Sequence, residues 1–449
     1  MKSYHLLLPT KLKGWLKKTK EDPPDITGFT ISRLEYLISE IVKHKQEKHP
    51  GAYSLLNMEY LRNIVPKAGD YLNLLKDQQV IEWVNHCDGR NSRMYRLTAK
   101  YDGATEYRTL TDQRLTRRIE RAYSQMKLRN SKKYPQLNRY VYSVSIDTAA
   151  ALHTIEDTYK YNLKDDKPKA EARRTFSLAE VDKIKEGRIY IKVNPTNFRY
   201  DTNFTRLPGE LVQHLSIDGY PLTELDIVNS QPFIAASLFD MTPEVEAVVS
   251  KFLGHFLTMY IKSLHLSEYE DVKLYRLMVT NGEFYEYMMR RFDETGIVYK
   301  DRVDAKEQIF TIFFGKNSAI HYSPTVRLFK AEFPNIYKVF EAIKEKAHNR
   351  LPILLQRIES HLMLDCVAQK ILTELPEVKF ITKHDSLLPS SFMIAGKTAE
   401  VEKLLPDIIE KIIGIRPTLK VKQPDPIFSY FNSYLSLSTH YVYQNPVTN

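Results

Sequence analysis

Cysteine and glycine are both scarce in this chain of 449 residues. The two cysteines, Cys87 and Cys366, lie far apart in the sequence, so they build neither a zinc-binding cluster nor a disulfide framework. A reducing cytosol is the natural compartment for such a chain. With 15 glycines, the sequence contains neither G-x-x-x-x-G-K-S/T nor G-x-G-x-x-G. The familiar glycine-built loops that cradle phosphates are therefore excluded.

Long apolar runs are also missing. No stretch reaches the roughly 18 consecutive apolar residues that a membrane-spanning helix needs. The apolar run within residues 1–9 is too short for the core of a signal peptide. We therefore expect a cytoplasmic protein of a bacterial or phage-infected cell, with no membrane partner.

The residues that are abundant indicate a globular, basic protein. Apolar residues make up 43% of the chain and charged residues 27%, which suits a buried core. At roughly 150 residues per domain, the length allows two to four domains. The 65 basic residues exceed the 55 acidic ones, and the net charge of +10 favours polyanionic partners. The 29 tyrosines suit stacking on bases, and they equally suit ordinary packing.

The N-terminal part of the chain suggests a small accessory domain. Residues 1–45 predict an irregular basic arm followed by a helix over residues 31–42. Residues 60–97 predict a helix, a turn, a second helix and a hairpin, which is the element order of a winged helix, with Arg90 and Arg93 near the wing. A small α+β domain without any DNA contact explains the same pattern.

A basic segment follows. Four arginines fall near one helical face, namely Arg114, Arg117, Arg118 and Arg121. This face is either simply solvated or tracks a nucleic-acid backbone. Residues 160–175 are highly charged and include Pro168, so we expect a linker or loop there.

The first candidate carboxylate is Asp226. Residues 222–228 predict a buried strand, and Asn229 or Ser230 can cap the following helix, with Pro232 in its first turn. Asp226 is therefore expected at the end of a rigid strand, a placement that suits a metal ligand. The alternative is an aspartate satisfied by nearby backbone N–H groups.

The segment over residues 302–315 combines cations and aromatics at helical spacing. Arg302, Lys306, Phe310 and Phe314 recur every four residues, which places them along one stripe of a helix. A nucleoside triphosphate has the same order, with phosphates at one end and sugar and base at the other. Gly315 would leave room where bases approach. The alternative is an amphipathic helix with its phenylalanines in the core.

The second candidate carboxylate is Asp385. Residues 378–390 predict a strand, a tight turn and a strand, with Asp385 at the turn and His384 able to hydrogen-bond toward a growing strand. The same residues also suit ordinary turn chemistry. Two carboxylates from separate strands are what a pair of Mg²⁺ ions roughly 3.5–4 Å apart requires. Magnesium needs few protein ligands besides substrate phosphates.

The order of these three segments resembles motifs A, B and C of the family A DNA polymerases. The single-subunit phage-type RNA polymerases share that architecture. Residues 302–315 match the motif R-x-x-x-K-x-x-x-F-x-x-x-Y/F-G throughout, and the resemblance covers roughly residues 185–400. His-Asp-Ser at residues 384–386 is similar to the RNA-polymerase branch. Gln231 stands where the DNA enzymes carry a glutamate that excludes the ribose 2′-hydroxyl, and Phe314 where both branches usually carry tyrosine.

The resemblance implies roles for individual residues. Asp226, Asp385 and the backbone carbonyl of Ile227 would hold two Mg²⁺ ions, with Mn²⁺ as a substitute. Lys306 would act in catalysis and, with Arg302, bind the triphosphate. The remaining residues implied are Gln231, Phe310 and Phe314 for the nucleotide and Arg188, Gln356, His384 and Gly315 for the primer and template.

The resemblance also implies an α+β, right-hand polymerase with an antiparallel palm sheet, helical fingers and a helical thumb, preceded by the winged-helix-like domain. The expected segments are an arm and helix (1–45), the accessory domain (46–105), a basic thumb-like region (106–175), the first palm part (176–240), the fingers (241–345) and the second palm part (346–449).

The implied activity is template-directed nucleotidyl transfer with nucleic acid and nucleoside triphosphates as partners. A DNA-directed DNA polymerase without a proofreading domain is favoured by Phe310. An RNA-making or primase-like enzyme is favoured by His-Asp-Ser and the missing glutamate. A third alternative is a DNA-binding replication initiator with an inactive polymerase-like body, against which the retention of Asp226, Lys306 and Asp385 argues.

Overall fold

The computed structural model describes residues 4–45, 51–84, 93–130, 133–296, 299, 301–390 and 395–423. The chain forms two compact units. Unit 1 comprises residues 1–191 and 202–218, and unit 2 comprises residues 192–201 and 219–449. Cys87 and Arg90, the latter predicted near a wing, lie outside the described residues.

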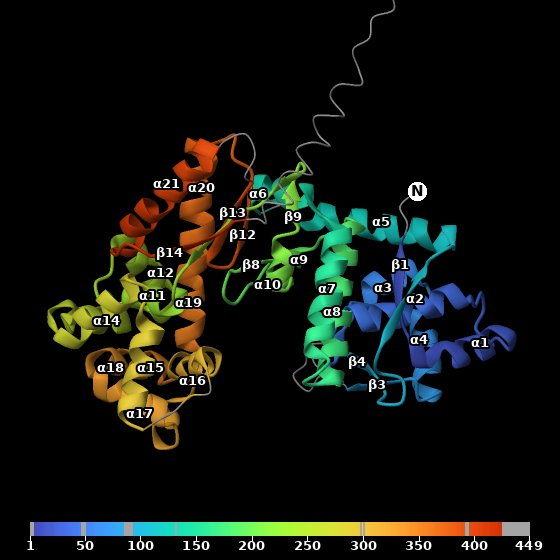
Figure 1. The fold of residues 1–449 in the computed structure, drawn as a ribbon, viewed down its shortest axis with the longest axis horizontal. Helices are drawn as coiled ribbons and strands as arrows, with labels where there is room; N and C mark the ends of the chain where they lie inside the picture. Colours follow the sequence, from blue (N-terminus) through green and yellow to red (C-terminus); the bar gives the residue numbers. More distant parts are fainter. Residues whose placement is uncertain are drawn as a thin grey trace, which may run out of the picture. The chain divides into compact units, whose positions relative to one another are not determined.

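Unit 1 is mostly helical, with short antiparallel strands (Figure 1). Its elements are β1 (His5–Pro9), η1 (Thr10–Leu12), α1 (Lys13–Glu21), α2 (Ile31–Lys43), β2 (Ser54–Leu55), α3 (Met58–Ile64), α4 (Ala68–Asp77), β3 (Ile81–Val84), β4 (Met94–Leu97), β5 (Thr105–Thr109), α5 (Gln113–Asn130), α6 (Pro135–Ser143), β6 (Val144–Ile146), α7 (Thr148–Asn162), α8 (Lys167–Lys185), α9 (Asn203–Arg206), α10 (Gly209–Val212) and β9 (Leu215–Ile217).

The predicted irregular arm is wrong for its first residues. β1 pairs antiparallel with β5, and the side chains of Leu6, Leu7 and Leu8 are all buried. The partner strand lies about a hundred residues further along the chain, so local sequence gave no sign of this pairing. The helix predicted over residues 31–42 is confirmed by α2.

The linker predicted over residues 160–175 is also wrong. Residues 148–162 and 167–185 form the helices α7 and α8, which pack against each other. Asp166 caps α8 by accepting a hydrogen bond from the backbone N–H of Lys169, and Pro168 lies in the first turn. Proline is well tolerated at that position, so here it marks the start of a helix and not a break in the structure.

The helix, turn, helix and hairpin predicted over residues 60–97 are confirmed as α3, α4, β3 and β4. Together with α2 and β2 they complete the order helix, strand, helix, helix, strand, strand. The sheet has the strand order β2-β4-β3. Any contact of these elements with nucleic acid stays a prediction.

Unit 2 combines one antiparallel sheet with a larger set of helices. Its elements are β10 (Tyr220–Pro221), β11 (Glu224–Ile227), α11 (Ser230–Ala236), α12 (Pro243–Leu253), α13 (His255–Ser263), η2 (Leu266–Glu268), α14 (Glu270–Thr280), α15 (Phe284–Glu294), α16 (Arg302–Phe314), η3 (Asn317–His321), α17 (Pro324–Glu332), α18 (Pro334–Lys344), α19 (Arg350–Ser360), η4 (His361–Val367), α20 (Ala368–Glu374), β12 (Phe380–Lys383), β13 (Ser386–Pro389), α21 (Ala395–Ile413) and β14 (Leu419–Lys422). Two further strands, β7 (Ile191–Val193) and β8 (Tyr200–Thr202), lie where the chain passes from one unit to the other.

The four-stranded sheet of unit 2 has the strand order β12-β13-β11-β14, and its neighbouring strands are all antiparallel. β12 and β13 form the predicted hairpin. β14 was not predicted, and it covers the edge of β11 that β13 leaves open. The strand predicted to carry Asp226 is therefore a central strand, hydrogen-bonded on both sides.

The helices of unit 2 gather around α19, with α15 to α18 near one end and the strands β12 and β13 near the other (Figure 1). Their core is a cluster of aromatic rings, in which Phe329 stacks on Phe340 with ring centroids 6.0 Å apart. The Tyr275 hydroxyl joins this cluster to α11 by donating to the carbonyl of Pro232 over 2.9 Å. The helices are thereby fixed to the segment that follows β11.

The predicted α+β class is confirmed. The finer division into palm, fingers and thumb stays a prediction. None of the described helices is long and apolar enough to cross a membrane.

Candidate active site

Strand pairing brings the two predicted carboxylates to the same part of the sheet. Asp226 on β11 lies opposite Ser386 on β13, and Asp385 directly precedes Ser386 in the turn between β12 and β13. The Ser386 hydroxyl donates a hydrogen bond of 2.7 Å to Asp226 Oδ1. The other oxygen, Oδ2, lies 3.8 Å from the Lys422 ammonium on β14.

The two carboxylates interact electrostatically. Burial raises the pKa of Asp385, and the negative charge of Asp226 raises it further. The Ser230 hydroxyl and the charge of Arg199 act in the opposite direction. A carboxyl whose ionisation is opposed by burial and by a neighbouring negative charge is stabilised in its charged form by a cation.

The loop after Asp226 and the turn that contains Asp385 each have a residue in the left-handed backbone conformation. Asn229, just after β11, has φ +54°, and so does His384 in the turn before Asp385. For residues other than glycine this backbone costs about 1–3 kcal/mol and is concentrated at functional sites. Asn229 precedes α11 without making a side-chain cap, contrary to one predicted option.

Glu359 on α19 is an unpredicted member of the site. It is 1% exposed, and Arg199 holds it with two hydrogen bonds of 2.8 Å each, from Nε and Nη2. Gln231 Nε2 donates to the same carboxylate over 2.6 Å. Burial raises the pKa of Glu359 to about 7, while Arg199 lowers it and the charge of Asp385 raises it.

Sequence reasoning missed Arg199 entirely. It lies in the loop after β7, and only tertiary structure brings it to α19. Glu359 did give a signal, because it is the one acidic residue in the otherwise apolar and basic helix α19. The same loop is fixed to α19 by a 2.8 Å hydrogen bond from Asn197 Nδ2 to Gln356 Oε1. In the structure, Gln356 therefore contacts Asn197. Its predicted contact with primer and template stays untested.

Several polar atoms around the carboxylates are buried without a hydrogen-bond partner in the described part of the chain. They are the two side-chain polar atoms of Asn229, Oε1 of Gln231 and Nδ1 of His384. Burial lowers the pKa of His384 to about 4, assisted by the charges of Arg199 and Lys383, so its ring is neutral at pH 7. Buried polar groups are normally satisfied, and a cluster of exceptions indicates a place where a polar ligand binds.

The helix predicted over residues 302–314 is confirmed as α16, and its predicted stripe does not face the core. Ala305, Ile309, Ile312 and Phe313 are the residues buried on its inner side. Lys306 is exposed, and Phe310 and Phe314 are half-buried. The alternative that places the phenylalanines of this helix in the core holds for Phe313, whereas Phe310 and Phe314 are only half-buried.

Contacts with neighbouring aromatic rings hold the side chains of the stripe in place. The Lys306 ammonium lies 5.5 Å from the ring centre of Phe310 and 5.6 Å from that of Tyr285 on α15. Phe310 and Phe314 meet edge to face, with centroids 5.5 Å apart. The Arg302 side chain lies outside what the structure describes, so its predicted place in the stripe is untested.

The glycine at position 315, just after α16, is required by the packing of the backbone. A Cβ atom at this position would lie 2.5 Å from the Thr311 carbonyl oxygen. The buried Lys344 ammonium donates to the carbonyls of Ile312 and Gly315 over 2.9 and 3.3 Å, and burial lowers the pKa of Lys344 to about 8. Close approach of the helix backbone explains this glycine without any base nearby, and its predicted contact with primer and template stays a prediction.

Arg188 lies in unit 1 and has internal partners. Its guanidinium contacts Glu186 at 2.6 Å and Glu40 at 3.2 Å, and the side chain is 9% exposed. A primer phosphate would have to displace one of these carboxylates. The predicted contact of Arg188 with a primer stays a prediction without support from this geometry.

The donor set at Asp226 and Asp385 fits magnesium with few protein ligands. No group of three or more His, Cys, Asp or Glu side chains suited to a metal lies in the described residues. Magnesium binds through one or two carboxylates plus substrate phosphates and water, so two carboxylates are sufficient. Burial and the charge of Asp226 both raise the pKa of Asp385, and a cation here would offset both effects.

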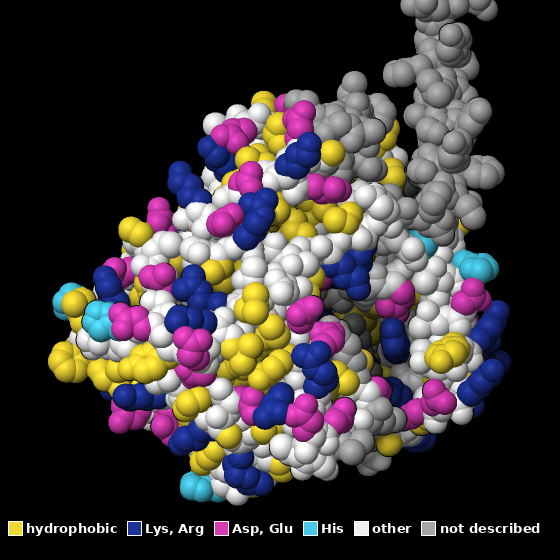
Figure 2. All heavy atoms as spheres, turned by 60° about the vertical axis from the view of Figure 1, so that its left-hand side comes forward, with side chains coloured by type: hydrophobic (Ala, Val, Ile, Leu, Met, Phe, Trp, Pro, Cys, Tyr) yellow, Lys and Arg dark blue, Asp and Glu magenta, His cyan; other side chains and the backbone are white. Residues whose placement is uncertain are grey.

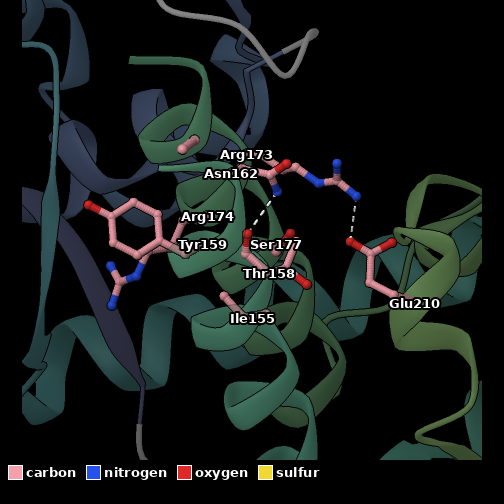
Figure 3. Close-up of a pocket in the computed structure, with 9 residues that line it drawn as sticks. Ile155, Thr158, Tyr159, Asn162, Arg173, Arg174, Ser177 and Glu210 are labelled. Carbon is pink, nitrogen blue, oxygen red and sulfur yellow. Dashed lines mark hydrogen bonds and ion pairs between the residues drawn. The ribbon is translucent and has the colours of Figure 1, made fainter. Parts of the chain in front are cut away.

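Cavities elsewhere do not compete with this site. Figure 3 shows a pocket in unit 1, lined by α7, α8 and Glu210, where Arg173 pairs with Glu210 at 2.8 Å. Its volume of about 10 Å³ holds no more than one water molecule. A second cavity of unit 1, of about 430 Å³, has Lys45 paired with Asp102 and Arg96 with Glu82 in its wall. These two cations are therefore neutralised, and the third cation of the wall, Lys11, donates to the Asp102 backbone carbonyl over 2.7 Å.

The face of the molecule drawn in Figure 2 gives no further indication of a ligand. In Figure 2, cationic and anionic side chains are interspersed over the face shown, and hydrophobic side chains also reach it. Phe256, Met259 and Leu277 are among the exposed hydrophobic residues of unit 2.

Comparison with known proteins found likenesses among solved structures and no match to a sequence family. No protein-family profile and no curated protein matches the sequence. Among solved structures, the chain is similar to the POL domain of Pol1 from M. smegmatis in complex with DNA primer-template and dNTP. The identity is 12%, the match covers 71% of this chain and 73% of that chain, and the TM-score is 0.36. We base the proposed function on the side chains of this chain and not on that likeness.

Proposed function

We propose that the protein is a template-directed nucleotidyltransferase with its catalytic site in unit 2. The observation that carries the proposal is the convergence of Asp226 on β11 with Asp385 in the turn before β13, amid buried polar atoms that have no partner among the described residues. The stripe of Lys306, Phe310 and Phe314 lies on α16 outside its buried face, and this position supports the proposal.

The reaction is attack of a primer 3′-hydroxyl oxygen on the α-phosphorus of a nucleoside triphosphate. A new P–O bond forms, the bond to the β-phosphate oxygen breaks, and pyrophosphate leaves. Asp226, Asp385 and the Ile227 carbonyl would hold Mg²⁺, which when bound stabilises charge on the attacking and leaving oxygens. The protein's own share is positioning and charge neutralisation.

The α16 stripe has the chemistry to orient the triphosphate. The Lys306 ammonium neutralises phosphate charge, with Arg302 as its expected companion one turn earlier. Phe310 and Phe314 offer apolar edges to the sugar and base. His384, neutral at pH 7, can exchange hydrogen bonds with the primer end through its unpartnered Nδ1.

A DNA-directed DNA polymerase is the form we favour, and one observation favours RNA synthesis as the second candidate. Gln231 is held through Nε2 by Glu359, while its Oε1 is a buried acceptor without a partner in the described residues. An acceptor at this position can receive a hydrogen bond from a ribose 2′-hydroxyl, which deoxyribose lacks.

Primer extension on a defined DNA template with Mg²⁺ tests the proposal, with dNTPs and rNTPs in separate reactions. We expect template-coded products that disappear in the Asp226→Ala/Asp385→Ala variant, and the productive nucleotide identifies the sugar. If primed and unprimed DNA and RNA all give no product with either nucleotide, the catalytic proposal is wrong. In that case, DNA binding unaffected by Asp226→Ala would favour the replication-initiator alternative.

A further inference from the structure

Helix α5 in unit 1 presents a row of arginines to solvent. Arg114, Arg117 and Arg121 are all exposed, while Leu115 and Ile119 on the opposite face are buried. Spacings of three and four residues place the three guanidinium groups on one face of the helix, spread over about 10 Å of its axis. The proposed catalysis in unit 2 uses none of them.

These three arginines differ from several others in unit 1. Arg96, Arg108, Arg173 and Arg174 each pair with a glutamate. The guanidinium groups of Arg114, Arg117 and Arg121 make no hydrogen bond or ion pair with any side chain in the described ranges of the chain. Their charge is therefore available to an external anion, and a guanidinium matches the geometry of phosphate.

The row lies beside a helix–turn–helix. α3 and α4 are joined by residues 65–67, and α5 packs on α3 (Figure 1). Arg118, the fourth arginine of α5, donates to the Ile64 carbonyl at the end of α3 over 3.5 Å. In helix–turn–helix domains, the second helix enters the major groove of a duplex and the first crosses the phosphate backbone. The row on α5 would therefore lie along that backbone.

The side chains of α4 are of mixed charge, so this helix alone would bind a polyanionic duplex weakly. Its exposed residues include Asp70 and Asp77 as well as Lys76 and Asn73. Lys76 is ordered over the Trp83 ring of β3, 4.4 Å from its centroid. A second helix of mixed charge needs a separate source of affinity, and the arginine row on the neighbouring helix supplies it.

We infer that unit 1 binds duplex DNA, with the arginine row of α5 on the phosphate backbone and α4 in the groove. A helix–turn–helix inserts one rigid helix into the groove of a nucleic-acid duplex. Single strands and acidic proteins have no such groove, so the partner is a duplex. This binding surface is additional to the primer and template contacts of the proposed catalytic site.

Fluorescence anisotropy with a labelled, blunt-ended DNA duplex tests the inference. The variant is Arg114→Gln/Arg117→Gln/Arg121→Gln. The control is Lys13→Gln/Lys17→Gln/Lys18→Gln on α1, which removes the same charge from three other exposed residues. Circular dichroism confirms that both fold. We expect the arginine variant to raise the Kd at least tenfold and to lower the slope of log K against log salt by about 2 to 3, at roughly 0.9 per phosphate contact. The lysine variant should change the Kd less than threefold.

Equal weakening by both variants would overturn the inference, because binding would then follow net charge alone. An unchanged Kd in the arginine variant would overturn it too, as would an equal loss with a single strand of the same length. Asp226→Ala/Asp385→Ala separates the two proposals, since it should retain duplex binding even though primer extension is lost. Duplex binding by a chain that makes no product would leave this inference standing and the catalytic proposal wrong.

Discussion

At the scale of single residues, Glu359 links Arg199 to Gln231 in the candidate site. It accepts two hydrogen bonds from Arg199 and one from Gln231, and it is fully enclosed. A buried carboxylate costs free energy unless it is paired, so this cluster stays in place only while all three members are present. It fixes Gln231, whose other amide atom lacks a partner among the described residues.

Glu359→Ala should lower the free energy of unfolding by about 3 kcal/mol, because it leaves the guanidinium of Arg199 without its carboxylate in a mostly buried place. A double-mutant cycle with Arg199→Ala, measured by urea denaturation, should give a coupling energy of about 1 kcal/mol or more. Strictly additive single effects would mean that the two side chains do not stabilise each other.

A second prediction at the scale of single residues concerns Gly315. Gly315→Ala should destabilise the protein by about 1–3 kcal/mol, since its Cβ would meet the Thr311 carbonyl oxygen at 2.5 Å. The matched control is Gly14→Ala in α1, where nothing lies within 4 Å of the added atom. There the substitution should stabilise the helix by about 0.5–1 kcal/mol. Thermal denaturation that ranks the two variants the other way round would refute this explanation of Gly315.

At the scale of elements, α16 separates its structural face from its proposed functional face. Its inner side is part of the aromatic core, where Phe313 and Phe340 have centroids 5.4 Å apart. Its outer stripe adds little to folding, because Lys306 is exposed and both phenylalanines are half-buried. Substitutions in the stripe should therefore affect activity and stability very differently.

Lys306→Ala should slow nucleotide incorporation by about 100-fold or more, if its ammonium stabilises charge on the transferring phosphate. The free energy of unfolding should change by no more than about 0.5 kcal/mol, as for other exposed sites. Glu307→Ala, at the exposed neighbour on the same helix, serves as control and should leave both quantities nearly unchanged. A slow Lys306 variant that is also strongly destabilised would point to a structural role instead.

Elements with strong local signals could be predicted from the sequence. α16 and the β12–β13 hairpin have clear periodicity and turn residues, and both were found where expected. β1 and β14 could not be predicted, because each is defined by a partner strand far away in the chain. α8 was missed because its charge and Pro168 looked like a linker, although Asp166 and Pro168 together form an ordinary helix start.

The candidate site was predictable only in part for the same physical reason. Asp226, Lys306 and Asp385 carry motif signals and lie on elements with regular patterns. Arg199 lies on a loop whose position depends on tertiary contacts with α19, such as the 2.7 Å hydrogen bond from Arg357 Nε to the Thr196 carbonyl. No local pattern in the sequence contains that information.

At the scale of the whole molecule, the proposed activities are divided between the two units. Unit 2 holds the carboxylates and the α16 stripe, and unit 1 holds the helix–turn–helix and the arginine row of α5. The excess of basic residues is consistent with phosphate-rich partners for both. The catalytic proposal is the central one, and it depends on two carboxylates.

The most direct test is the single-turnover rate of nucleotide incorporation as a function of Mg²⁺ concentration. The wild type is compared with Asp226→Asn, Asp385→Asn and the control Glu224→Gln. Glu224 lies on the same strand as Asp226 and pairs with Lys422 at 2.7 Å, but has no proposed part in catalysis. We predict that each aspartate variant loses about 1000-fold or more in rate, as expected when a group that stabilises the transition state is removed. Glu224→Gln should stay within a few-fold of the wild type. Incorporation by either aspartate variant within tenfold of the wild-type rate would contradict the account.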